Sequence, residues 1–298
     1  MALTVFTAAR CLDHDPGRGH PESPERLRVL LARLAAEKDL IVSEAPTAPV
    51  AALRRVHAPG YLDVLVSLAN RGGGTLDPDT RMNKASWDAA CRAAGAALAA
   101  VRHADGGHGH AFAAIRPPGH HALAARAMGF CLLANAVIAA REAQVLGRRQ
   151  ILIVDWDVHH GNGTQALVEL DPSIRYVSLH EWPAYPGTGA ASERGVGNVF
   201  NVPRAPGLPP ERYVADLREA ILAATNGWAP DLVLVSAGYD SMRGDPLGGF
   251  TLEPPHYPML VETLLARCPG RPLVGVLEGG YNPGRLADGV IATLRALI

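Results

Sequence analysis

The sequence predicts an α/β protein with one mainly parallel sheet of about eight strands flanked by helices, on three observations. Short apolar runs alternate along the chain with longer Ala- and Leu-rich stretches that have helical spacing. Several Gly/Pro clusters directly follow an apolar run, as loops at strand ends do. No long low-complexity linker and no internal repeat divides the 298 residues, so we expect a single domain over residues 1–298.

The predicted strands are short runs rich in branched apolar residues, which are typical of strands buried on both faces of a sheet. In chain order they are LTVF (3–6), HAFAAI (110–115), ILIVD (151–155), IRYVSL (174–179), NVFNV (198–202), LVLVS (232–236) and LVGVL (273–277). Each is too short for a core helix and is followed by turn-forming or polar residues.

The predicted helices are the longer stretches between these strands, and their apolar residues recur with helical spacing. They cover residues 24–38, 85–103, 129–146, 210–225 and 254–268. Ser23 followed by Pro24 is a typical helix start, since serine is a preferred N-cap and proline suits the first helical position. Within the loop before that start, we expect His14 and His20 to be solvated.

Composition favours a soluble cytoplasmic protein. The 28 Lys+Arg and 29 Asp+Glu give a net charge of -1, which supplies no global attraction to nucleic acid or to an anionic membrane. The four cysteines are far apart and form no CxxC pair, so neither a zinc ribbon nor a redox site is indicated and a reducing compartment is expected. The first residues do not resemble a signal peptide, and no segment reaches the roughly 20 apolar residues of a membrane-spanning helix.

The most informative motif is DWDVHHGNGT, which directly follows the predicted strand 151–155. Asp155, Asp157 and His159 are spaced two apart, so on an extended chain they project to one side and offer two oxygen ligands and one nitrogen ligand. An ordinary turn, with Asp155 as a cap, is the structural alternative. Three such residues together, followed by His160 and a glycine-containing loop, favour chemistry over that alternative.

Three further strand ends carry candidate functional groups. RPPGHHA places His120 and His121 on a loop stiffened by proline, SAGYD supplies Asp240, and EGGY places Tyr281 beside two glycines. Asp245 before Pro246 reads as a turn. Catalytic metal sites commonly use three protein ligands and leave one position open. One histidine and two carboxylates neutralise a divalent ion, and such a site needs a general base, a role that suits the paired histidines.

These residues resemble the signature blocks of the histone deacetylase and acetylpolyamine amidohydrolase family. The blocks are DWDVHHGNGT, RPPGHHA, GFCLLANAV, VSLH, YPGTG, SAGYDSMRGDPLGG and EGGYNP, and the early HPESPERL resembles a class II block. They occur in the family's order from Gly19 to about Pro283 and cover nearly the whole chain. The resemblance implies an arginase/deacetylase fold and a zinc-dependent hydrolase that removes acetyl or other acyl groups from lysine side chains of proteins or peptides.

The resemblance also implies two metal sites. It assigns one catalytic zinc ion to Asp157, His159 and Asp240. It assigns a structural potassium ion to Asp155, Ser178 and Leu179, with the backbone of Asp157 and His159. Iron or cobalt would accept the same oxygen and nitrogen ligands as zinc.

Catalytic roles carried over from the family fall on four residues. His121 would be the general base and then the acid, His120 its electrostatic partner and Asp155 the group that orients His120. Tyr281 would donate a hydrogen bond to the oxyanion as water attacks the amide. Asn162 stands where some members carry an aspartate that pairs with the second histidine, which implies a less basic His121. The block HPESPERL adds a rim or foot-pocket role for Arg26.

The substrate tunnel implied by the resemblance is lined by Gly129, Phe130, Tyr185 and Leu247. Leu247 stands where polyamine-selective relatives carry an acidic residue, so we favour acetylated lysine in a peptide or protein over an acetylated polyamine or another small N-acyl amine. A catalytically silent acyl-lysine-binding module is a further alternative, which loss of a ligand or of Tyr281 would favour. A two-manganese, arginase-like enzyme is a more distant one, and metal content separates it from a one-zinc site.

Overall fold

The computed structural model describes residues 2–298 and is built around one sheet of eight parallel strands. The order across the sheet is β2, β1, β5, β10, β9, β6, β7, β8. The strands span Leu40–Glu44, Leu3–Thr7, Ala111–Ala113, Leu273–Leu277, Leu232–Ala237, Ile151–Asp155, Ile174–Glu181 and Val199–Arg204 in that order. The predicted α/β class with about eight strands is therefore confirmed.

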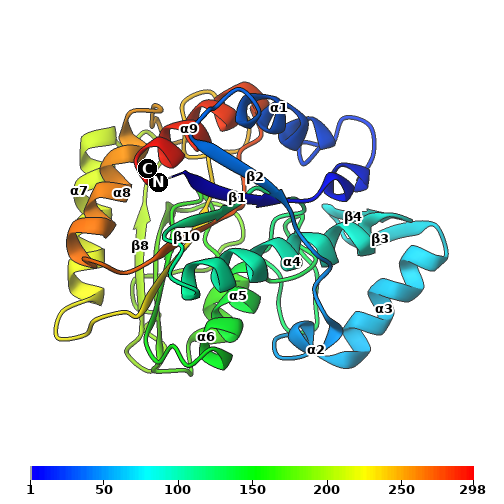
Figure 1. Ribbon diagram of the computed structural model, residues 1–298, viewed down its shortest axis with the longest axis horizontal. Coiled ribbons are helices and arrows are strands. Elements are labelled where there is room, and N and C mark those ends of the chain that lie inside the picture. Colours follow the sequence, from blue (N-terminus) through cyan, green and yellow to red (C-terminus); the bar gives the residue numbers. More distant parts are fainter. Residues whose placement is uncertain (1) are drawn as a thin grey trace.

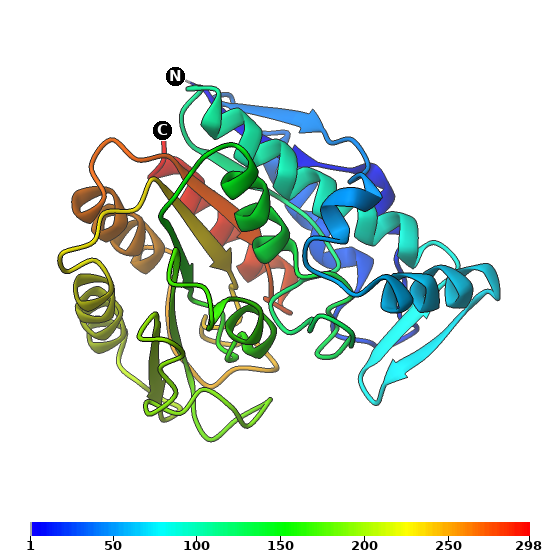
Figure 2. The same cartoon turned by 90° about the horizontal axis from the view of Figure 1, so that it is seen from below.

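Helices cover both faces of the sheet. The packing contacts place α1 (Pro24–Leu34), α9 (Pro283–Arg295), α8 (His256–Arg267) and α7 (Pro210–Ala224) in one layer, and α4 (Ser86–Asp105), α5 (Asn135–Val145) and α6 (Asn162–Val168) in the other. Figure 1 shows α7 beside α8 and α1 beside α9, and Figure 2 shows α4 and α5 on the opposite side of the sheet from α9. The four central strands are buried along their whole length because both faces are covered.

All seven predicted strands correspond to strands of the sheet, but other elements are absent from the prediction. These are β2, the short helix α2 (Val50–Leu53), α3 (Pro59–Asn70), the antiparallel hairpin β3 (Gly73–Asp77) and β4 (Thr80–Asn83), α6 and α9. The edge strand β2 is half exposed and therefore gives only a weak apolar signal. The start of α9 was recognisable, because Asn282 caps it and Pro283 follows.

The helix expected over residues 129–146 is wrong in its first turn and a half, since α5 begins only at Asn135. Gly129 and Phe130 have φ values of 56° and 67°, in the left-handed region that a right-handed helix cannot contain. Phe130 is the only non-glycine residue in the described part of the chain with a positive φ. This turn carries two of the expected tunnel residues toward the site.

A buried ionic cluster ties the amino-terminal segment to the sheet. Glu22 is fully buried and pairs with Arg116 at 2.7 Å and with Arg26 at 3.0 Å. His14 lies 3.3 Å from Glu22 and 2.7 Å from the hydroxyl of Ser86. The expectation that His14 is solvated is therefore wrong, because His14 fills a place in this buried network and is only 2% exposed.

Among residues 2–298, no helix is both long enough and apolar enough to cross a membrane.

Candidate active site

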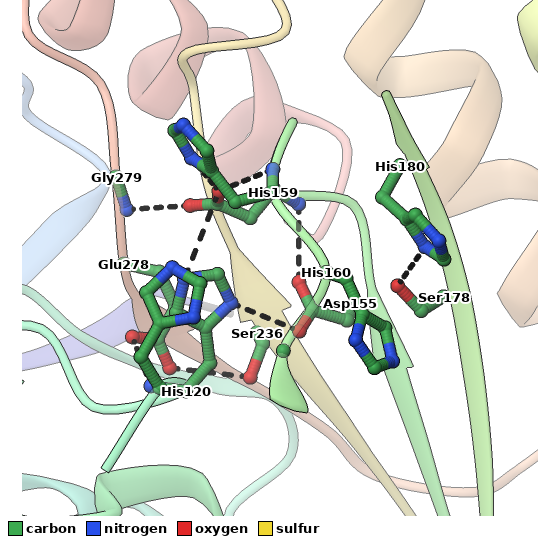
Figure 3. A network of polar contacts seen from close by, with 12 residues as sticks. His120, Asp155, His159, His160, Ser178, His180, Ser236, Glu278 and Gly279 are labelled. Atoms are coloured by element: carbon green, nitrogen blue, oxygen red, sulfur yellow. Dashed lines mark hydrogen bonds and ion pairs between the residues drawn. The ribbon is translucent and has the colours of Figure 1, made fainter. Parts of the chain in front are cut away.

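The four loops that carry the motifs each follow a strand, and these four strands are neighbours in the sheet. The strands β5, β10, β9 and β6 lie side by side in that order, and they lead respectively into RPPGHHA, EGGY, GYD and DWDVHH. Since parallel strands all end at the same edge, the side chains of these loops converge there. Figure 3 shows the convergence around His120, Asp155 and His159.

Asp157, His159 and Asp240 form a compact group of possible metal ligands. One ligand atom from each lies within 4.8 Å of the others. The Nδ1 atom of His159 lies 3.0 Å from Oδ1 of Asp157 and 3.3 Å from Oδ2 of Asp240. This juxtaposition of one imidazole nitrogen and two carboxylates suits a divalent cation such as zinc.

Backbone groups hold the two carboxylates and leave an oxygen for a cation. Asp240 accepts a hydrogen bond from the backbone N–H of Val158 at 2.9 Å through Oδ1. Its buried Oδ2 accepts no hydrogen bond from the described residues, although Nδ1 of His159 lies 3.3 Å away. Asp157 accepts from the N–H of Gly279 at 2.8 Å. A Cβ on Gly279 would lie 2.0 Å from Oδ2 of Asp240, so glycine is needed there. The buried, unpartnered oxygen fits a bound metal ion.

His120 lies against two carboxylates at the buried end of the site. Its Nδ1 is 3.1 Å from Oδ2 of Asp155, which also accepts from the hydroxyl of Tyr176 at 3.0 Å, and its Nε2 is 3.7 Å from Asp157. Burial opposes a charge on the imidazole, but Asp157 and Asp155 outweigh it and raise the pKa of His120 to about 10. Asp155 therefore lies within hydrogen-bonding distance of His120 and favours its charged form.

His121 has a different environment from its neighbour. Its Nδ1 lies 2.7 Å from Oδ1 of Asn162, whose amide nitrogen faces the sulfur of Met128, so Nδ1 carries the proton and Nε2 is left as an acceptor. Burial lowers the pKa of His121 well below its usual range, and positive charge on His120 and His159 lowers it further. The ring packs edge-on against Tyr185 with centroids 5.1 Å apart.

Tyr281 is held from two sides. Its backbone N–H donates to Asp245 at 2.6 Å, and Asp245 also accepts from the N–H of Leu247 at 2.9 Å. The guanidinium of Arg26 lies 4.8 Å from the centre of the Tyr281 ring. Burial raises the pKa of Tyr281 well above its usual range, so the hydroxyl stays protonated and can donate a hydrogen bond.

A cavity of about 240 Å³ leads to these groups. The expected tunnel residues Gly129, Phe130, Tyr185 and Leu247 all line it, together with Asp79, Ala184, His121, His159 and Tyr281. Tyr185 and Leu247 are each 39% exposed, which places them near the mouth. A Cβ on Gly129 would lie 2.3 Å from the ring of His121, so glycine allows this wall to approach the histidine.

The residues implied for potassium lie behind the site on β6 and β7. Asp155 pairs with Ser178 in the register of these strands, and Leu179 is the next residue. All three side chains are buried. The hydroxyl of Ser178 lies 2.9 Å from Nδ1 of His180. His160 also turns away from the ligand group, toward Thr188 and Gln165 at 2.8 and 2.9 Å.

Some residues of the site have no distinct signal in the sequence. Asp79 and Ala184 line the cavity but belong to segments that read as ordinary loops. Asp245 reads as a turn residue, and it does accept a turn hydrogen bond, yet it also fixes the backbone of Tyr281. Glu278 is part of EGGY, and no local pattern indicates that its carboxylate reaches the histidine loop. Such contacts between distant segments become visible only in the folded chain.

Comparison with known proteins gives one consistent result. The family model described as "Histone deacetylase domain" matches residues 20–297. Histone deacetylase 15 of Arabidopsis thaliana is 39% identical over 94% of this chain, which spans 53% of that longer protein. The histone deacetylase-like amidohydrolase of Pseudomonas aeruginosa is 36% identical over 89% of this chain and 73% of its own length. The crystal structure of the HDA15 HD domain superposes with a TM-score of 0.95 at 37% identity, covering 99% of this chain and 88% of that one.

Proposed function

The chain belongs to the histone deacetylase family, and from that premise we propose that it hydrolyses acetyl or other acyl amides on lysine side chains of peptides or proteins. The family is hydrolytic and its relatives are named deacetylases and amidohydrolases, so the chain is a hydrolase of this kind. The observation that carries the proposal is the placement of His121, Tyr281 and the three-ligand group on one narrow cavity.

Asp157, His159 and Asp240 are the residues that would hold zinc. The unpartnered oxygen of Asp240 and the glycine at 279 support this assignment. When bound, the ion supplies Lewis-acid activation of water and of the amide carbonyl. The two carboxylates would formally neutralise the charge of a divalent ion. Such a site acidifies bound water less than a site of neutral ligands does, so a separate proton acceptor is necessary.

The protein groups would then divide the proton transfers. His121, neutral and with Nε2 free, takes a proton from the attacking water and later returns it to the departing amine. His120, held by Asp155, is the electrostatic partner of His121. The hydroxyl of Tyr281 donates to the carbonyl oxygen as negative charge develops there.

The cavity suits a neutral acyl group on an aliphatic stem. Phe130, Tyr185 and Leu247 offer apolar or aromatic surface, and burying an acetylated amine against them requires no desolvation of a charge. A free lysine ammonium would have to lose its hydration in the same place. Leu247 adds no negative charge at the mouth, which supports acyl-lysine as the substrate.

Asp79 is the specific observation in favour of a second candidate, an acetylpolyamine or other small N-acyl amine. It lines the same cavity, and a carboxylate there could attract the cationic amines of a polyamine. Its Oδ1 accepts hydrogen bonds from the backbone N–H of Gly129 at 3.2 Å and from the hydroxyl of Thr80 at 2.7 Å. These bonds occupy part of its acceptor capacity, so we rank this candidate second.

The substrate class can be decided by comparing kcat/KM for an acetyl-lysine peptide with that for N-acetylputrescine and N-acetylspermidine. We expect the peptide to be favoured by at least about tenfold, a difference of about 1.4 kcal/mol. A preference for the polyamines that disappears in Asp79→Asn would instead establish the second candidate. Asp63→Asn, a change at an exposed carboxylate on α3, is the matched control.

The metal assignment predicts about one divalent ion per chain after purification with zinc, because only one three-ligand group occurs among residues 2–298. Asp240→Asn should weaken zinc affinity by at least about 10- to 100-fold, the loss typical of removing a partner that only orients a ligand, since here an anionic ligand itself is removed. Elemental analysis and zinc titration against a chelating dye measure both quantities. Two ions per chain would contradict a one-zinc site and favour arginase-like chemistry.

Two further assignments complete the proposal. Asp155, Ser178 and Leu179 would contribute to a potassium site, which their position on adjacent buried strands supports. Residues 2–298 would form a single catalytic domain, supported by the one sheet that contains strands from Leu3 to Leu277.

A further inference from the structure

Glu278 is a fully buried carboxylate that has no part in the proposed chemistry. It follows β10 directly and precedes Tyr281 by three residues. No lysine, arginine or histidine of the described chain forms an ion pair with it within 4.0 Å. Burying a carboxylate without such a partner costs stability, so its contacts require an explanation.

The side chain of Glu278 instead holds the backbone of the histidine loop. Its Oε2 accepts from the N–H of Gly119 at 2.6 Å and from the N–H of His120 at 3.1 Å. Its Oε1 accepts from the hydroxyl of Ser236 on β9 at 3.2 Å. Figure 3 shows the contact between Glu278 and Ser236, next to His120. One carboxylate therefore fixes two successive amides next to the proposed base.

The histidine loop is also tightly packed where Glu278 holds it. A Cβ on Gly119 would lie 2.5 Å from the backbone nitrogen of Asn135 and 2.7 Å from the carbonyl oxygen of Leu133. The loop is thus set against the start of α5 on one side and against Glu278 on the other. A shift of the Glu278 carboxylate would leave two buried N–H groups without an acceptor.

The main chain of Glu278 is held from the opposite direction. Arg26 donates to the carbonyl oxygen of Glu278 at 2.5 Å and to that of Gly280 at 2.6 Å, and its guanidinium lies against the ring of Tyr281. Arg26 pairs with Glu22, which also pairs with Arg116 at the start of the histidine loop. The hydrogen bonds and ion pairs therefore close a ring that contains both the histidine loop and the Tyr281 loop.

We propose that Glu278 is a positioning residue that sets the distance and orientation between the histidine loop and the Tyr281 loop. It acts through the backbone of Gly119 and His120 and does not contact the reacting atoms. A base and an oxyanion donor carried by separate loops must be held to a fraction of an ångström, and a misplacement of about 1 Å can lower a rate about 10²-fold. This inference rests on the proposed function, in which His121 is the base and Tyr281 is the oxyanion donor.

Two substitutions at Glu278 separate positioning from charge. Glu278→Gln keeps the length and one oxygen acceptor for the two amides but removes the charge. Glu278→Asp keeps the charge but is one methylene shorter and cannot reach both amides from the same backbone position. We expect Glu278→Gln to retain kcat within about fivefold, and Glu278→Asp to lose about 10²-fold in kcat with KM within about threefold.

The measurements are kcat and KM on an acetyl-lysine peptide, zinc content, and the urea midpoint of each variant. Ser236→Ala, which removes only the contact to Oε1, is the matched control and should stay within about threefold of the wild-type kcat. A contribution to stability alone would lower the urea midpoint of Glu278→Asp and leave the kcat of its folded, zinc-loaded form unchanged, which would overturn the proposal. The reverse pattern, an active aspartate variant and an inactive glutamine variant, would show an electrostatic role and overturn it too.

The remaining outcomes are also decisive. If Glu278→Asp does not fold, a loss of about 10²-fold in kcat by a folded, zinc-loaded Glu278→Gln still overturns the positioning role. Failure of the proposed function has a separate signature, in which the wild-type chain hydrolyses no acyl amide or His121→Ala retains full activity.

Discussion

Replacing His121 with alanine is expected to lower kcat on an acetyl-lysine peptide by about 10²- to 10⁴-fold, the range typical of a positioned general base. Asn162 fixes the protonated nitrogen of the ring, and burial keeps the imidazole neutral at physiological pH. The remaining nitrogen is then a proton acceptor, and the residue lines the same cavity as His159. Among the described residues, the only other histidine that lines the cavity is His159, which belongs to the proposed ligand group.

We expect His121→Ala to keep its zinc content, since His121 lies outside the proposed ligand set. Zinc content and folding of the variant must be measured, because a loss of either would also lower kcat. His108→Ala makes the same chemical change at an exposed histidine and serves as the control. A His121→Ala enzyme that keeps a tenth or more of the wild-type kcat would contradict the assignment of the base. His120→Ala would then be the next variant to measure, because His120 lies 4.0 Å from His121 between ring centroids.

Tyr281→Phe is expected to lower kcat by about 10²- to 10³-fold while KM changes little, as for the loss of one oxyanion donor. The phenol remains protonated because burial raises its pKa, so its hydroxyl is available to donate in the transition state. Asp245 and Arg26 hold the backbone and the ring in place. The phenylalanine ring should occupy the same space and preserve the contact with Phe130.

Tyr61→Phe is the matched control for Tyr281→Phe. It removes a hydroxyl that donates to the carbonyl oxygen of Leu132 at 2.7 Å, and it should cost about 1 kcal/mol of stability without lowering kcat. Kinetics on the peptide together with thermal unfolding of both variants provide the comparison. If the activity of Tyr281→Phe stays within a few-fold of wild type, Tyr281 is not the oxyanion donor.

The two kinetic predictions depend on residues that reach the cavity from separate loops. His121 follows β5 and Tyr281 follows β10, and these strands are neighbours although they lie far apart in the chain. The buried ring through Glu22, Arg26 and Glu278 connects the same two loops. Variants of Glu278 therefore test whether the scaffold, apart from the reacting groups, limits the rate.

The sequence alone was sufficient for the fold class and for the family, because both depend on local patterns. Runs such as ILIVD and LVLVS read as buried strands, and all seven predicted strands occur in the sheet. The motifs at their ends resemble family blocks, which is why the sequence pattern points to Asp157, His159, Asp240 and Tyr281, and the structure brings these four residues to one place. The left-handed turn at Gly129 and Phe130 was missed, since apolar spacing does not report a local change in backbone handedness.

What only the tertiary structure decided is which of these segments meet and what holds them. The neighbouring strands β5, β10, β9 and β6 come from distant parts of the chain. Hydrophobic periodicity does not indicate the order of strands in a sheet. His14 looked like a solvated loop residue and is buried against Glu22, while Glu278 reaches the amides of Gly119 and His120 across 158 or more residues. The sequence thus determined the chemical groups, because these lie within short motifs. Their positioning depends on long-range hydrogen bonds and ion pairs, which form only when the chain has folded.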